Sequence, residues 1–113
     1  MSELRISVAR DFSPYPGPRY IHQGPFSGEK FRKVLVKELR KGGTVLVDLD
    51  GTTGFGSSFL DEAFGGLIRN EGFRLAELRK IIRIKSDLDR SYKIEAEEAM
   101  QEAEQNIIGK KAR

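Results

Sequence analysis

Hydrophobic residues follow the spacing of β-strands in three places along the chain. Residues 4–8 alternate between apolar and polar, which is the period of a half-buried strand. The run Thr-Val-Leu-Val-Asp-Leu at 44–49 is apolar without alternation and predicts a strand buried on both faces. Lys-Ile-Ile-Arg-Ile-Lys at 80–85 predicts a further strand, whereas residues 73–79 fit a strand, a short helix or a loop.

Three segments between these strands have the spacing of amphipathic helices. In the first, 28–41, apolar residues recur every four positions after Ser27, which is an N-cap residue type, and a Gly-Gly pair follows. The second, 58–70, carries a wide apolar stripe, and the third covers roughly 89–108. All four prolines lie in the loop between the first strand and the first helix. The order β-α-β-α-β-α predicts an α/β fold with helices packed on a mixed or parallel sheet.

The length of 113 residues indicates a single domain. We expect its core to span about 4–105 and residues 106–113 to form a flexible basic tail. No apolar run approaches the roughly 20 residues that span a bilayer, and no export signal is visible at the N-terminus. The chain has no cysteine and a single histidine, His22, which removes thiol chemistry and multi-histidine metal sites. We therefore expect a cytoplasmic protein without a metal or a cofactor.

Charge is distributed unevenly along the chain, although the net charge is only +3. The 28–41 segment is strongly basic, and residues 95–104 carry only acidic charges. Such polarity steers charged partners, but it is also what two solvated helix faces look like. No aromatic residues alternate with the basic ones, so we do not expect nucleic-acid binding through 28–41, for which charge is the only indication.

The end of the second strand has the pattern of a phosphatase motif. Val-Leu-Val-Asp-Leu-Asp-Gly-Thr-Thr-Gly at 45–54 is similar to the first motif of haloacid-dehalogenase-type phosphohydrolases. In that chemistry Asp48 is the nucleophile and Asp50 the general acid, and a magnesium ion holds the phosphate. The same residues also suit a structural turn, in which Asp48 accepts hydrogen bonds from loop amides. Because no later strand ends in an acidic pair except through Ser-Asp-Leu-Asp-Arg-Ser at 86–91, we favour a non-enzymatic function and keep the phosphohydrolase as the alternative.

Two segments carry a resemblance to a known family. Gly-Phe-Gly-Ser-Ser-Phe-Leu-Asp-Glu-Ala-Phe-Gly-Gly-Leu-Ile-Arg at 54–69 and Ser-Gly-Glu-Lys-Phe-Arg at 27–32, with Arg-Tyr before them, resemble the STAS-like domain family of unknown function. This family is similar to the STAS domains of anti-sigma-factor antagonists, whose pattern has Asp and Gly where this chain has Gly56 and Phe59. The resemblance implies a STAS-like α/β fold, with a mixed sheet of about four strands and three or so helices.

The resemblance also implies a function in regulation by protein contact. Ser58 matches the serine that an anti-sigma kinase phosphorylates, and Ser57 precedes it. The implied partner is a histidine-kinase-like ATPase or another anti-sigma-type protein from a separate chain. The implied contact surface is the loop and helix start that follow the second strand, with an arginine of the proline-rich loop. Its residues are Gly54, Phe55, Gly56, Asp61, Glu62 and Arg19.

The chemistry of this surface can also be argued from the residues. Ser58 with Asp61 three positions later has the spacing of a capping box, which predicts that these side chains cap the helix. A phosphate on Ser58 would meet the positive end of the helix dipole, whereas Asp61 and Glu62 would repel it. Arg19 is placed to pair with a phosphate or with a partner's carboxylate.

Overall fold

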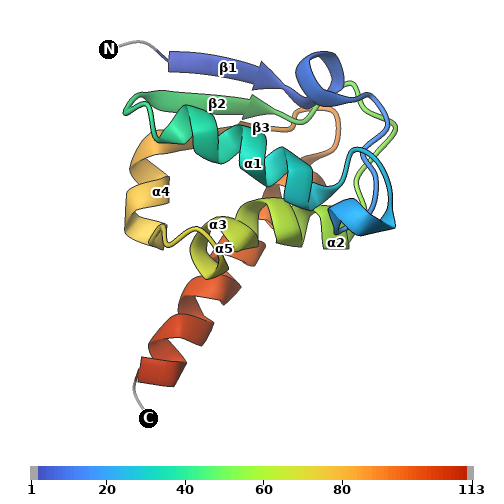
Figure 1. The fold of residues 1–113 in the computed structure, drawn as a ribbon. Helices are drawn as coiled ribbons and strands as arrows, with labels where there is room; N and C mark the ends of the chain where they lie inside the picture. The colour runs from blue at the N-terminus through green and yellow to red at the C-terminus, as the bar shows by residue number, and fades with distance from the viewer. Residues whose placement is uncertain (1–2, 112–113) are drawn as a thin grey trace.

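The structure, a computed structural model that describes residues 3–111, is an α/β domain with a parallel sheet (Figure 1). The strands are β1 (Glu3–Ser7), β2 (Thr44–Asp48) and β3 (Ile82–Lys85), paired in the order β1-β2-β3. Both pairings are parallel. The α/β class is confirmed, but the expected mixed sheet of about four strands is not found within the described residues. The sheet is parallel and not mixed because a helical crossover follows each of the first two strands and returns the chain to the same end of the sheet.

One face of the sheet is buried and the other is open. The register places Ile6, Val47 and Ile84 beside one another on the buried face, where they are at most 8% exposed. The opposite face carries the exposed Arg5 and Arg83 and the half-buried Leu46. The helices gather on one side of the strands (Figure 1). The strand β2 is therefore not buried on both faces as its apolar sequence predicted.

The basic helix α1 (Gly28–Leu39) follows the proline-rich loop and packs on the buried face of the sheet. The side chain of Ser27 accepts a hydrogen bond from the Lys30 amide at 3.0 Å, which confirms the predicted N-cap. Before this helix the chain makes a turn of π-helix, η1 (Val8–Phe12), and a turn of 3₁₀-helix, η2 (Ile21–Gln23). The predicted strand over 4–8 therefore ends one residue early, at Ser7, whose side chain accepts a hydrogen bond from the Arg10 amide.

The helix predicted over 58–70 is one helical run from Ser57 to Arg69 with a wide turn in its middle. Its three parts are α2 (Ser57–Leu60), the π-helical turn η3 (Asp61–Gly65) and α3 (Gly66–Arg69). The apolar stripe is buried as predicted, because all of its large side chains are at most 2% exposed. These side chains are Phe59, Leu60, Phe64, Leu67 and Ile68.

The last part of the chain contains two helices. The segment that the sequence left open forms α4 (Leu75–Ile81), which leads directly into β3. The helix α5 (Arg90–Lys111) packs its alanines on η3 and α3, and its C-terminal part projects away from the body (Figure 1). This helix continues through most of the segment assigned to a basic tail, and Ala112 and Arg113 lie outside the described residues. Within 3–111 no helix combines the length and the apolar character that crossing a membrane requires.

Candidate functional site

The serine segment, Gly54–Ser58, lies at the surface where the helical run begins. Ser57 and Gly56 are exposed and Ser58 is half-buried. Gly56 occupies the N-cap position, and no side chain there accepts a hydrogen bond from the first free amides. The predicted capping box of Ser58 and Asp61 is therefore wrong, because the helix begins one residue before Ser58 and the Asp61 carboxylate binds arginines instead.

Aromatic packing anchors this segment from below. The side chain of Phe55 is buried, with its ring centroid 5.3 Å from that of Phe59 and 5.2 Å from that of Tyr92. Gly54 has φ of 125°, and a Cβ there would lie 2.9 Å from the Tyr92 hydroxyl oxygen. Only glycine fits this position without strain. The segment therefore presents its serines outward on a fixed base.

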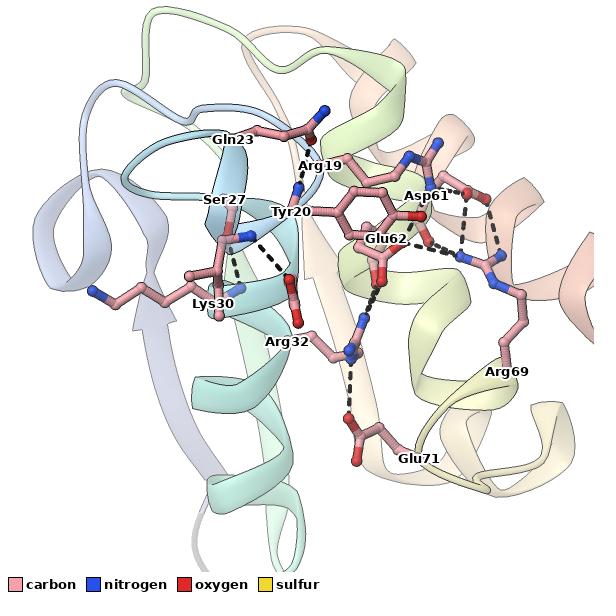
Figure 2. Close-up of polar contacts among 12 residues, drawn as sticks. Arg19, Tyr20, Gln23, Ser27, Lys30, Arg32, Asp61, Glu62, Arg69 and Glu71 are labelled. Carbon is pink, nitrogen blue, oxygen red and sulfur yellow. Dashed lines mark hydrogen bonds and ion pairs between the residues drawn. The ribbon is translucent and has the colours of Figure 1, made fainter.

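An ion-pair network begins immediately after the serines, at Asp61. Arg19 from the proline-rich loop donates to the Asp61 carboxylate at 2.6 Å, and Arg69 donates to it at 3.1 and 3.2 Å (Figure 2). Burial alone would raise the pKa of Asp61, but the hydrogen bonds from Arg19 and Arg69 outweigh it and hold that pKa below its usual value. Arg19 also donates to the Glu62 carboxylate at 3.2 Å. The loop is thereby tied to the first two residues of the π-helical turn.

The second half of the network is buried between α1 and the helical run. Arg32 is 6% exposed and Glu62 is 5% exposed, and their charged groups form an ion pair. The Arg32 guanidinium also donates to the Glu62 backbone oxygen at 3.1 Å and to the Glu71 carboxylate at 3.0 Å (Figure 2). Each side of this guanidinium is thus matched by an acceptor, as a buried charge requires.

Two consecutive glycines make room for the arginines. A Cβ on Gly66 would lie 2.6 Å from Nη1 of Arg32, and a Cβ on Gly65 would lie 2.7 Å from Nη1 of Arg69. Cβ atoms in proteins essentially never approach other heavy atoms this closely. The Gly-Gly pair inside a helix is therefore explained by the close approach of two guanidinium groups, and not by a helix end.

The six residues of the expected contact surface are placed unequally. Arg19, Gly54 and Asp61 are half-buried, and Gly56 is exposed. Phe55 and Glu62 are buried, so their side chains serve the packing and the ion-pair network described above. The surface of this region consists of Ser57 and Ser58 with the backbone around them and the edge of the Arg19–Asp61 pair.

The acidic pair of the phosphatase-like motif lies at the C-terminal end of β2. Asp48 accepts hydrogen bonds from the Asp50 amide and from Arg5, both at 2.9 Å. Asp50 accepts from Lys85 at 2.8 Å and from the amides of Asp87 and Leu88 at 3.1 and 2.9 Å.

Asp50 is thereby tied to the loop that follows β3, whereas Asp48 holds the turn after β2 and pairs with Arg5 of β1. Burial would raise the pKa of Asp50, but Lys85 and the two loop amides lower it overall. Within residues 3–111 no group of three or more acidic, histidine or cysteine side chains is placed to hold a metal ion. Both carboxylates are engaged in holding loops.

The comparison with protein families agrees with this arrangement. A family model described as a STAS-like domain of unknown function matches residues 27–89, which run from the cap of α1 to the loop after β3. The chain belongs to this family. Searches of curated proteins and of solved structures give no significant match. The match to this STAS-like domain covers more than half of the chain and includes both halves of the ion-pair network apart from Arg19.

Sequence reasoning missed Arg32, Arg69 and Glu71 as parts of the STAS-like domain's network. A signal was present for Arg32, because it lies four and seven positions before Val36 and Leu39 on the buried stripe of α1. A charged residue on a buried stripe requires a partner. Gly-Gly in the middle of a helical pattern was a second signal of close approach.

Proposed function

We propose that this STAS-like domain is a regulatory protein-interaction domain without catalytic activity of its own. Its partner is an ATPase of the histidine-kinase-like class or a related anti-sigma-type protein. The contact surface is the serine segment, and a phosphate on Ser58 abolishes binding. The observation that carries this proposal is that the serines stand at the surface start of a helical run whose other residues are committed to the core and to ion pairs.

The electrostatic surroundings of Ser58 favour an added phosphate. The free amides at the start of the helical run attract a dianion, because they form the positive end of the helix dipole. The repulsion expected from Asp61 and Glu62 is reduced, because Arg19 and Arg69 neutralise the first carboxylate and Arg32 the second. The serine segment can therefore gain negative charge without facing two unpaired acids.

Exposed apolar side chains beside the serine segment support a protein as the partner. The amide of Thr53 donates to the Pro14 oxygen at 2.9 Å, which joins the loop before the serines to the proline-rich loop. That loop exposes four large apolar side chains, more than an isolated surface residue would account for. They are Tyr15, Tyr20, Ile21 and Phe26. Aromatic residues of this kind are enriched where proteins bind one another.

The engaged carboxylates support a function without catalysis. A phosphatase nucleophile must reach a phosphorus atom, whereas Asp48 is 8% exposed and hydrogen-bonded on both oxygens. We expect Asp48→Asn to leave any background hydrolysis of p-nitrophenyl phosphate with magnesium unchanged. A magnesium-dependent activity that disappears in this variant would replace the proposal with the phosphohydrolase.

The test of the switch compares three baits. The wild type, Ser58→Ala and Ser58→Asp are immobilised, and purified histidine-kinase-like ATPase domains from the same organism are passed over each with ATP analogue and magnesium. We expect the wild type and Ser58→Ala to retain an ATPase domain and Ser58→Asp to lose it. Equal retention by all three baits, or retention by none, would contradict the proposal.

A further inference from the structure

A groove of about 860 Å³ follows the outer side of β3, on the part of the molecule that the proposed switch does not use. Its walls are α4 and the first half of α5, and its floor includes β3 itself. No residue of the serine segment lines it. In the part of the chain that the structure describes, no strand pairs with this side of β3, which is the last strand of the sheet. The groove therefore contains a free strand edge.

The backbone of β3 offers hydrogen-bonding groups to this groove. The Lys85 carbonyl oxygen accepts from the Leu49 amide at 2.8 Å, so the backbone groups of Lys85 face β2. Successive residues of a strand alternate in this direction, which turns the amide and the carbonyl of Ile84 toward the groove. The carbonyl of Ile82 is turned the same way. An added strand pairs with such groups, and an open edge is the usual template for a peptide strand.

The groove has a strongly basic rim. Five basic residues line it against two acidic ones, namely Arg79, Arg83, Lys85, Arg90 and Lys93 against Asp87 and Glu97. Lys85 is neutralised by Asp50 and Asp87 at 2.8 and 3.1 Å, and Arg83 pairs with Glu3 at 3.1 Å. Among the described residues, Arg79, Arg90 and Lys93 have no carboxylate within salt-bridge distance. Glu97 on α5 offsets one of these charges, so the net uncompensated charge is positive on both walls.

The floor of the groove is apolar. The lining includes Leu46 on β2, Ile82 and Ile84 on β3, and Ile94 and Met100 on α5. Ile82, Ile84 and Met100 are buried, whereas Ile94 in the same lining is 53% exposed. A ligand that fits both features has apolar side chains toward the floor and acidic side chains toward the rim. Alternation of this kind is the pattern of an extended strand.

We propose that β3 binds an extended acidic segment of another protein as an added fourth strand of the sheet. Backbone hydrogen bonds to Ile82 and Ile84 supply the pairing, and the charges of Arg79, Arg90 and Lys93 select acidic sequences. A second copy of this chain fits less well, because antiparallel pairing of two β3 edges would bring the same basic residues together. The site acts independently of Ser58.

The probe is a phage-displayed library of eight-residue segments that alternate apolar residues with Asp or Glu, selected against the whole chain. A matched library with Lys or Arg in place of the acids serves as control. We expect enrichment from the acidic library only, and we expect the selected synthetic peptides to slow hydrogen exchange of the Ile84 amide. N-methylation of alternate peptide amides should abolish binding, because it removes the donors of an added strand.

A charge variant and its matched control then place the peptide. Arg90→Glu with Lys93→Glu should weaken binding by about tenfold or more, whereas Lys33→Glu with Lys37→Glu on the exposed side of α1 should leave it unchanged. The proposal would be overturned if the acidic library is not enriched, if the N-methylated peptide binds fully, or if the hydrogen exchange of the Ile84 amide is unchanged. So would a dimer of the free chain that Arg83→Glu dissociates, since a second copy would then occupy the edge. Ser58→Asp should not alter peptide binding, so failure here is separable from failure of the switch.

Discussion

The two halves of the segment 54–69 are used in opposite ways. In the first half, Gly54–Ser58, the serine side chains make no cap, and Ser57 is exposed and Ser58 half-buried. In the second half, Phe59–Arg69, the apolar residues are buried and the charged residues bind arginines or acids on other elements. One continuous stretch of sequence thus contains two surface serines that cap nothing, on a base fixed by Phe55, and a highly constrained helix.

The difference shows which residues of a family motif are required by the structure of the protein. The Asp-Glu-Ala-Phe-Gly-Gly-Leu-Ile-Arg portion is required by the ion pairs, by the close approach of Arg32 and Arg69, and by the core. A similarity that includes this portion is good evidence for the fold. Within the serine segment, Gly54 and Phe55 are fixed by packing against Tyr92, whereas the two serines have few structural demands and are the residues free to meet a partner. Substitutions in the two halves should therefore differ in their effect on the free energy of unfolding.

The largest loss of stability is expected for Glu62→Ala. This change leaves the buried Arg32 guanidinium without its nearest carboxylate, which typically costs about 3–5 kcal/mol. Urea unfolding measures the change. The double variant Arg32→Met with Glu62→Leu removes both charges and should recover most of the loss. A cost below about 1 kcal/mol for Glu62→Ala would mean that the second half is less constrained than its geometry implies.

A smaller loss is expected for Gly66→Ala. The added Cβ would collide with Nη1 of Arg32 at 2.6 Å, and moving the guanidinium weakens its ion pairs, so we expect a cost of about 1–3 kcal/mol. Gly109→Ala is the matched control, because a Cβ there meets nothing within 4 Å and alanine favours a helix. Urea unfolding of both variants gives the comparison. Equal effects at the two glycines would remove the argument from close approach.

The Asp61 carboxylate should make the free energy of unfolding depend on pH. Its folded-state pKa lies below the usual value, so the stability that its ion pairs contribute is complete above the unfolded pKa of about 3.9 and is lost as pH falls through the folded pKa. Asp61→Asn should therefore be less stable than the wild type at pH of about 7, and the two should converge toward pH of about 2. Unfolding measured across this range checks the trend. A difference independent of pH would contradict the ion-pair explanation.

The sequence predicted most of the fold because periodicity reports burial. The alternation at 4–8, the apolar run at 44–49 and the four-residue spacing of α1 all come from side chains that face the core, and all three elements are found. Residues 73–79 were undecided because in α4 only Leu78 is fully buried, which leaves little pattern. The expected number of strands was wrong because the resemblance to STAS domains supplied it, and the segment 73–79, which also fitted a strand, forms α4 instead.

The site was predicted less well than the fold. The positions of Ser57 and Ser58 at a helix start followed from the apolar stripe behind them, which had to dock on the body. The role of Asp61 did not follow, because its two arginines come from 42 residues before it and 8 residues after it, across a loop whose path no local pattern encodes. The π-helical turn that brings Asp61 and Glu62 together at Arg19, and Glu62 to Arg32 as well, has no sequence period of its own.

The smallest effect on stability is expected in the serine segment itself. Neither Ser57 nor Ser58 accepts a capping hydrogen bond, so replacing each with alanine should change the free energy of unfolding by less than about 0.5 kcal/mol. Ser27→Ala is the control, because Ser27 is fully buried and caps α1 through the Lys30 amide, and it should cost about 1 kcal/mol. Ser58→Asp should also fold normally, since an acid at the start of a helix is favourable. If Ser58→Ala instead costs as much as Ser27→Ala, the serine is a structural cap, and the two halves of the segment do not differ in the way that a switch surface requires.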